Sequence, residues 1–172
     1  QEADELETRD VAAADRMRAR ARLLYRRARD YALRGLEIRH RDFERALRAG
    51  PKSAVAAATL SDVPLLYWTA AAWGAEISLS KDNPGIVAEQ PVVEALIDRA
   101  LHLDESFDQG AIHSFLITYE PSRQGARGEA EDRSRKHFER AMVLSGGHQA
   151  GPLVALAESV SVARQDRREF EE

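Results

Sequence analysis

Residues 65–75 read LLYWTAAAWGA, and this stretch holds both tryptophans of the chain beside a single polar side chain. A helix that is apolar on all sides is normally a central one that other helices cover. Ser61 or Asp62 suits the N-cap and Pro64 suits the first turn, which predicts a helix from there to about Leu79. The apolar run is shorter than the roughly 18–20 residues that a membrane span needs. We therefore expect it to form core, or the wall of a cavity.

The composition is that of an ordinary globular protein with a charged surface. Of 172 residues, 44% are hydrophobic and 31% are charged, and the net charge is -4. One domain covering residues 1–172 is predicted from this length. A nucleic-acid-binding domain normally carries a basic excess, so nucleic acid is not an expected partner. No cysteine is present, which excludes disulfides and thiolate chemistry within this chain.

The two ends of the sequence suggest a fragment. The chain opens on Gln1 without an initiator methionine, signal peptide or lipid-attachment cysteine, and it stops at Glu172 within a helical pattern. We interpret it as a segment without its signal or lipidation region and without the end of a C-terminal helical pair.

Apolar residues recur at helical spacing, and no alternating strand pattern occurs, which predicts an all-α fold. In the first long helix, one face is predicted to pack inward, and the opposite arginine-rich face is expected to be solvated. The predicted inward face consists of Ala21, Leu24, Ala28, Tyr31, Gly35 and Ile38, widened by Tyr25, Ala32 and Leu36. The opposite face holds Arg20, Arg27 and Arg34. The predicted helices cover about 17–38, 41–49, 61–79, 92–101, 107–119, 130–144 and 151–163, with an alanine-rich connection at 52–60 and loops at 80–85 and 121–128.

A short motif ends three of these helices: an acidic residue, arginine, alanine and a bulky apolar residue, at 44–47, 98–101 and 139–142. A bulky apolar residue stands three positions before each alanine, as expected where two helices of a repeat cross closely. The pattern predicts tetratricopeptide (TPR)-like antiparallel hairpins in a short superhelix. Its spacing is longer than the 34 residues of that repeat, so extra residues fall in loops. A four-helix bundle is the alternative. The alanines are Ala46, Ala100 and Ala141, and the bulky residues are Phe43, Ile97 and Phe138.

In order along nearly the whole chain, the sequence resembles the T component associated with TRAP transporters, the TatT-like proteins of the bacterial envelope. The similar stretches are Leu24-Tyr25 with Arg27-Ala28 and Tyr31, Tyr67-Trp68 with Ala72-Trp73-Gly74, RALHLDE at 99–105, GAIH at 110–113 with Phe115-Leu116, His137-Phe138 with Arg140-Ala141, Leu144-Ser145, Leu156-Ala157-Glu158, and Gln165-Asp166.

The resemblance implies a non-enzymatic periplasmic protein, either lipid-anchored in its full-length form or a soluble relative, with TPR-like hairpins around a hydrophobic pore or cleft. It also implies a homotrimer that docks the periplasmic substrate-binding subunit of a TRAP transporter. A small hydrophobic or organic-acid (carboxylate) ligand would pass through the pore. No cofactor is implied.

Aromatic residues near the centre of the chain are the first ligand-binding candidates. Trp68 and Trp73 are five apart on a helix and cannot share one face, so one of them packs while the other lines a cavity, or both are core. Tyr67 and the small residues beside it favour a cavity with aromatic walls. His113 and Tyr119 complete the predicted ligand set, although a histidine on an apolar face is also a common hydrogen-bonded core residue.

Arg123 and Arg127 lie in a glycine-containing loop, where they can meet an acidic partner or simply be solvated. The histidines lack the partners at helical spacing that a metal site needs, and no nucleophile motif occurs, so no metal, cofactor or catalytic residue is predicted. An enzyme would require a carboxylate or hydroxyl beside His113. The remaining alternative is a generic TPR scaffold that binds a peptide in its concave groove and buries both tryptophans.

Overall fold

A computed structural model describes residues 2–123 and 125–171, apart from the side chains of Glu2 and Asp4. Every regular element in these ranges is helical and none is a strand, which confirms the all-α prediction. The chain forms two compact units, one from Gln1–Ala58 with Pro64–Arg99 and the other from Thr59–Val63 with Ala100–Glu172. A single domain over 1–172 stays a prediction. None of the helices in the described ranges is long and apolar enough to cross a membrane.

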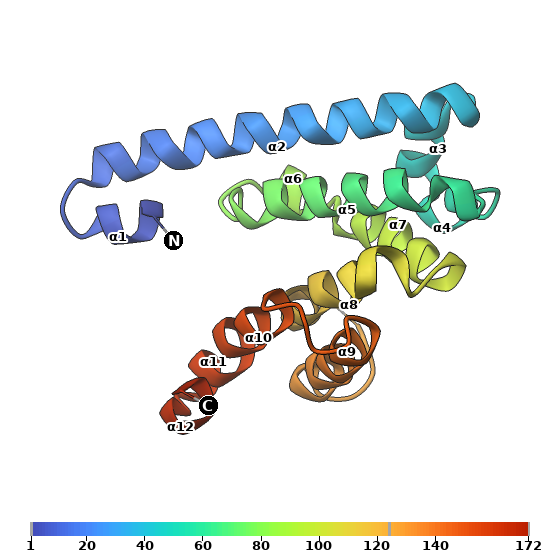
Figure 1. Cartoon of the computed structure of the whole chain (residues 1–172). Helices are drawn as coiled ribbons and strands as arrows, with labels where there is room; N and C mark the ends of the chain where they lie inside the picture. The colour runs from blue at the N-terminus through green and yellow to red at the C-terminus, as the bar shows by residue number, and fades with distance from the viewer. Residues whose placement is uncertain (1, 124, 172) are drawn as a thin grey trace. The chain divides into compact units, whose positions relative to one another are not determined.

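The order of the helices follows the predicted pattern closely, with additional short elements at both ends and in the loops (Figure 1). The elements are α1 (Glu2–Glu7), α2 (Val11–Arg39), α3 (Phe43–Ala49), α4 (Pro51–Val55), the 3₁₀ turn η1 (Leu60–Asp62), α5 (Val63–Ser78), α6 (Pro84–Val87), α7 (Gln90–Leu103), α8 (Phe107–Tyr119), the 3₁₀ turn η2 (Glu120–Ser122), α9 (Ala130–Leu144), α10 (Gly151–Leu156), the π-helical turn η3 (Ala157–Ser161), α11 (Val162–Arg164) and α12 (Arg167–Glu171).

The long helix α2 buries only part of the predicted face. Asp10 caps its start by accepting a hydrogen bond from the backbone N–H of Ala13 at 2.9 Å. The stripe of Leu24, Tyr31 and Ile38 is exposed, and Ile38 keeps 88% of its surface. The predicted inward face is therefore wrong at these three positions and right at Ala32 and Leu36, which are buried. The expected exposure of the arginine-rich face is confirmed. The buried residues of α2 are Ala14, Ala32, Leu33 and Leu36.

Helix α5 matches the predicted tryptophan helix, with a different N-terminal cap. The Asp62 carboxylate reaches back to the backbone N–H of Thr59 at 2.8 Å, so the helix is entered through η1. Trp73 is fully buried, but Trp68 keeps 58% of its surface. The expectation that this helix is covered on nearly every side is therefore wrong on the Trp68 side.

Helices α2 and α5 approach closely because α2 carries a glycine at the contact. A Cβ built on Gly35 would lie 2.9 Å from a methyl carbon of Leu65, too close for an ordinary contact. The two helices run alongside one another in the first unit (Figure 1). Their proximity brings charged side chains of α2 to the C-terminal half of α5.

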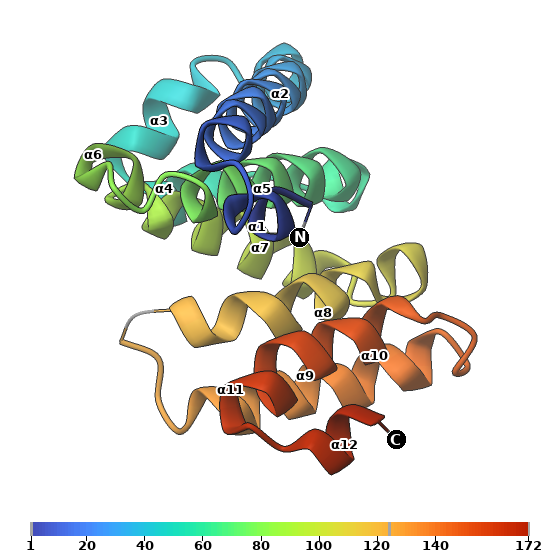
Figure 2. The ribbon, with the colours of Figure 1, turned by 90° about the vertical axis from the view of Figure 1, so that its left-hand side faces the viewer.

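In the second unit, α8 packs along α9, and α10 lies beside both (Figure 2). Gly110 has φ of 89°, and a Cβ there would meet the Cα of Ala141 at 3.3 Å. Ala141 is buried at a close helix crossing, as the repeat predicts. Ala46 is exposed, however, so the repeat prediction is wrong at its first copy. The core of this unit includes Ile117, Leu156 and Val160, with Phe138 packed against them.

Overpacking this crossing is expected to be costly. Ala141→Leu adds three carbons where α8 and α9 are closest, and it should lower the free energy of unfolding by about 1–3 kcal/mol. Val143→Leu, on the exposed side of α9, is the control and should stay within about 0.5 kcal/mol of wild type. Urea unfolding followed by circular dichroism measures both. Equal stability of the two variants would contradict the crossing.

Candidate functional site

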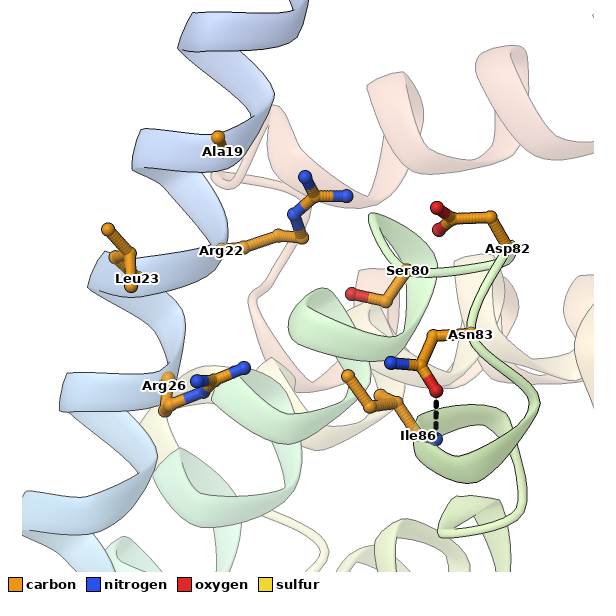
Figure 3. Close-up of a pocket in the computed structure, with 8 residues that line it drawn as sticks. All are labelled: Ala19, Arg22, Leu23, Arg26, Ser80, Asp82, Asn83 and Ile86. Atoms are coloured by element: carbon orange, nitrogen blue, oxygen red, sulfur yellow. Dashed lines mark hydrogen bonds between the residues drawn. The ribbon is translucent and has the colours of Figure 1, made fainter.

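A pocket of about 400 Å³ opens in the first unit between α2 and the segment that joins α5 to α6 (Figure 3). One wall is a single face of α2, because its four lining residues are spaced by three, one and three positions. The facing wall comes from residues 80–86. Its size is within the usual range for small-molecule sites. The lining residues are Ala19, Arg22, Leu23, Arg26, Ser80, Asp82, Asn83 and Ile86.

The segment after α5 is held by local hydrogen bonds that leave several polar groups available. Asn83 caps α6, and its side-chain oxygen accepts from the backbone N–H groups of Gly85 at 3.1 Å and Ile86 at 3.4 Å. Ser80 is 2% exposed, and its hydroxyl has no hydrogen-bond partner among the described residues. In Figure 3 this hydroxyl points toward α2. A buried hydroxyl without a partner is unusual and unfavourable.

Two arginines on the α2 wall differ in how their charge is balanced. Arg22 donates to the backbone carbonyl of Leu79 at 3.0 Å, and no carboxylate in the described part of the chain lies within 4.0 Å of it. Arg26 donates from Nε to the Glu76 carboxylate at 2.9 Å. This hydrogen bond raises the pKa of Arg26. Within the described residues, Arg22 is therefore a half-buried cation without an anionic partner.

Glu76 is the buried carboxylate of a charged cluster next to the pocket. It is 1% exposed, and it also accepts from Arg29 at 2.7 Å, so it binds two guanidinium groups. The Arg29 guanidinium carbon lies 4.8 Å from the centre of the Trp73 ring. A buried carboxylate with two charge-assisted hydrogen bonds satisfies the usual condition for keeping a charge out of water.

Trp73 belongs to this cluster and does not line the pocket. Its indole N–H donates to Glu89 at 2.8 Å, and Glu89 also forms an ion pair with Arg48. The Arg48 guanidinium lies 5.6 Å from the Trp73 ring centre. Trp73 thus lies in packed surroundings, and ligand binding by this residue stays a prediction.

Tyr67 and Trp68 lie in the first unit as an edge-to-face aromatic pair. Their ring centres are 5.1 Å apart, Tyr67 is half-buried and Trp68 is exposed. They are separate from the pocket lining. The remaining predicted site residues all lie in the second unit, so the predicted ligand set is divided between the two units.

In the second unit, His113 and His137 face one another with their Nδ1 atoms 2.8 Å apart. One nitrogen must donate and the other must accept, so one of the two rings carries no proton on its Nδ1. The Nε2 of His113 lies 3.5 Å from Glu105, and the Nε2 of His137 lies 3.8 Å from Glu120. Burial lowers the pKa of His113, and Glu105 opposes this effect in part.

Acid is expected to destabilise the second unit through His113. Because its pKa is lower in the folded chain, the unfolded chain takes up a proton more readily below the ordinary value of 6.5. The stability that neutral His113 contributes is present above pH 6.5 and is lost as pH falls toward the lowered pKa. Urea unfolding of wild type and His113→Gln at pH 7.5 and 5.5 tests this.

The His113→Gln variant should lose less stability between the two pH values than wild type does. His148→Gln, at an exposed histidine, is the control and should keep the wild-type difference. The groups facing His113 are His137 and Arg140 from α9 and Glu105 from the turn before α8. An unchanged pH dependence in His113→Gln would contradict the assignment.

Tyr119, Arg123 and Arg127 lie at the end of α8 and in the segment that follows it, where Glu120 is buried. Tyr119 is buried and stacks on Phe115 at 5.3 Å. Arg123 forms an ion pair with Glu120 at 3.1 Å, whereas Arg127 is exposed. Arg133 pairs with the same carboxylate. Arg123 therefore stabilises the fold, and partner binding by Arg123 and Arg127 stays a prediction.

The residues that the sequence analysis did not single out are those of the pocket and of its charged neighbour: Arg22, Arg26, Arg29, Glu76, Ser80, Asn83 and Glu89. Two signals were present in the sequence. Three arginines at 22, 26 and 29 share one face of a helix, and Glu76 interrupts an otherwise apolar one. The described residues contain no group of three or more histidine, aspartate or glutamate side chains that could hold a metal.

These features define an all-helical protein with a charged pocket. Comparison with known proteins identifies its family: over residues 1–172 the chain matches the TRAP transporter T-component, and it belongs to that family. It is similar to an uncharacterized protein of Treponema pallidum (strain Nichols), with 23% identity over 158 residues that cover 90% of this chain and 49% of the relative. The chain thus spans about half the length of this curated relative.

Proposed function

We propose that the protein docks the substrate-binding subunit of a TRAP transporter and does so on the periplasmic side of the membrane. The observation that supports this best is the exposed apolar stripe of α2, formed by Leu24, Tyr31 and Ile38. These residues are seven apart and lie on one face of a 29-residue helix. An exposed apolar surface of this kind is typical of a protein-protein contact.

Arginines border the stripe and indicate the charge of the partner. The guanidinium groups of Arg27 and Arg34 lie 5.5 and 4.2 Å from the centre of the exposed Tyr31 ring. The segment from Val11 to Arg39 has nine arginines and three acidic residues, although the whole chain is acidic. A complementary partner presents an apolar patch with an acidic rim, and its binding should weaken as salt increases.

Titration calorimetry with the substrate-binding subunit of a TRAP transporter from the same genome tests the docking. Ile38→Asp and Leu24→Asp alter exposed positions, so both variants should fold and bind at least about tenfold more weakly. Val143→Asp, an exposed apolar position in the second unit, should bind as wild type does. Absence of binding by folded wild-type protein would refute the docking function. Wild-type affinity of both α2 variants would show that the stripe on α2 is not the docking surface.

The finer features that the resemblance implies belong to the same proposal. The helix pair α8 and α9, with its close crossing at Gly110 and Ala141, supports TPR-like hairpins in a short superhelix. Assembly into a homotrimer and a lipid anchor in the full-length protein are proposed with it. Sedimentation velocity of the isolated chain tests the trimer.

We also propose that a hydrophobic ligand contacts Tyr67 and Trp68, because this aromatic pair is partly open to solvent. In a Trp73→Phe background Trp68 is the only tryptophan, so its fluorescence reports on this site alone. A fatty acid should quench or shift the emission. An unchanged spectrum would favour the generic scaffold that binds a peptide.

A further inference from the structure

We propose that the pocket between α2 and residues 80–86 binds a pyranose sugar, that is, an uncharged ring with neighbouring hydroxyl groups. The inference goes beyond docking by α2 and beyond the ligand of Tyr67 and Trp68, since it concerns another surface of the first unit and another class of ligand. Three features of the pocket support it. They are a balanced charge, polar side chains that need both donors and acceptors, and an apolar strip beside them.

The charged cluster beside the pocket needs no charge from a ligand. Arg26 and Arg29 share the buried Glu76 carboxylate, at 2.9 and 2.7 Å. Arg29 also forms an ion pair with Asp30 at 3.0 Å. Two positive and two negative charges therefore face one another, and each of the four side chains already has an oppositely charged partner. The requirements on a ligand come from the other residues that line the pocket.

The two remaining charges of the pocket lining have opposite signs. Arg22 donates one N–H to the Leu79 carbonyl, and neither Arg22 nor Asp82 forms an ion pair within the described residues. An anion would suit Arg22 but meet Asp82, and a cation would do the reverse. A hydroxyl group can accept from a guanidinium and donate to a carboxylate, so it suits both. Asp82 is exposed, so water already solvates its charge, and the ammonium group of a zwitterion would add little.

The wall opposite α2 provides two more polar groups. The Ser80 hydroxyl is 2% exposed, lacks a partner within the described residues and points toward α2 in Figure 3. A buried hydroxyl without a partner is unfavourable, so a ligand that supplies one gains affinity. The α6 cap uses only the side-chain oxygen of Asn83, which leaves its amide N–H₂ to donate. Because the donors and acceptors lie on both walls, several hydroxyl groups on one ring are needed to meet them.

Apolar side chains complete the match to a sugar ring. Ala19 and Leu23 on α2 and Ile86 on the opposite wall line the same pocket. A pyranose has C–H groups on its faces and hydroxyl groups around its edge, so its faces can cover these side chains while its edge meets the polar ones. The pocket volume of about 400 Å³ is within the range of small-molecule sites and exceeds the size of one ring.

Five probes separate these requirements in titrations of the isotope-labelled chain, followed by the NMR shifts of the backbone amides between residues 80 and 86. They are D-glucose, trans-cyclohexane-1,2-diol, cyclohexanol, cyclohexanecarboxylate and the zwitterion taurine. We expect glucose and the diol to bind, and cyclohexanol to bind about 2- to 10-fold more weakly than the diol for each hydrogen bond that it lacks. The carboxylate and taurine should bind no more tightly than cyclohexanol. The proposal is overturned if any of the last three probes matches or exceeds the diol, or if neither glucose nor the diol shifts these amides.

Variants show whether the pocket lining is responsible. Asp82→Ala alters an exposed side chain, so it should fold, and it should weaken binding of the diol about 10- to 100-fold by removing a charged acceptor. Arg22→Met should weaken it by a similar factor. Lys81→Ala is the control and should bind as wild type does, because Lys81 is exposed next to Asp82 but does not line the pocket. Wild-type affinity of a folded Asp82→Ala variant would refute the site.

Ser80→Ala tests the buried hydroxyl separately from the charges. It removes a hydroxyl that has no partner within the described residues, so the melting temperature should not fall. Binding of the diol should weaken about 2- to 10-fold. A Ser80→Ala variant with unchanged affinity would contradict the role of this hydroxyl. None of these measurements uses a transporter subunit or the fluorescence of Trp68, so their failure and failure of the proposed function are distinguishable.

Discussion

Replacement of Glu76 by alanine is expected to lower the free energy of unfolding by about 3–5 kcal/mol, because it breaks a buried ion pair from one side. Arg29, whose side chain is 11% exposed, would lose its buried partner and keep only the half-exposed carboxylate of Asp30. Urea unfolding at neutral pH measures the change. Glu139→Ala, at an exposed position of α9, should stay within about 0.5 kcal/mol of wild type.

A double variant distinguishes a lost ion pair from lost packing at the same site. Arg29→Met with Glu76→Leu removes both charges, and it should be less destabilised than Glu76→Ala alone. Arg26 would then lose its partner too, but half of its side chain is already exposed to water. If Glu76→Ala lowered the free energy of unfolding by less than about 1 kcal/mol, the Glu76 carboxylate would not be the group that stabilises this charged cluster.

Trp73→Ala is expected to cost about 3–5 kcal/mol, the range for removing a large aromatic side chain from a packed core. The indole is fully buried and its N–H donates to Glu89. Trp68→Ala is the matched control, since it removes the same side chain five positions away at an exposed site. It should stay within about 1 kcal/mol of wild type. A stable Trp73→Ala variant that loses a bound ligand would instead place Trp73 on the wall of a cavity.

Trp73→Phe separates the hydrogen bond from the packing. Phenylalanine fills most of the same space but leaves Glu89 without its indole donor. The expected loss is about 1.5–3 kcal/mol, as for other hydrogen bonds to a charged group. Thermal and urea unfolding should both rank Trp73→Phe between wild type and Trp73→Ala in stability.

Local pattern was enough to predict most helices but not which face of α2 is buried. The bounds of α9 follow from its apolar spacing and from the glycines after Leu144. Those of α8 match the prediction, although its first turn contains three residues with positive φ, Asp108, Gln109 and Gly110. On α2, however, Arg22 and Arg29 are half-buried, whereas Leu24, Tyr31 and Ile38 are exposed. A pattern of apolar against polar residues assigns arginine to the surface. Here Glu76 of α5 forms ion pairs with Arg26 and Arg29, so these arginines face another helix.

The candidate pocket could not be predicted from the sequence for a similar reason. Residues 80–85 have turn chemistry, and that chemistry is present in Asn83 and Pro84. Whether the Ser80 hydroxyl finds a partner depends on how the turn meets α2, which no local rule specifies. The aromatic residues predicted as one ligand set lie in two units for the same reason, because spacing along one helix does not determine contacts between helices.

Glu76 accepts hydrogen bonds from two guanidinium groups that come from successive turns of another helix. Positions 26, 29 and 76 should therefore change together among homologous chains. A homologue with an uncharged residue at 76 should also have replaced at least one of the two arginines, and one that keeps both should keep an acid there.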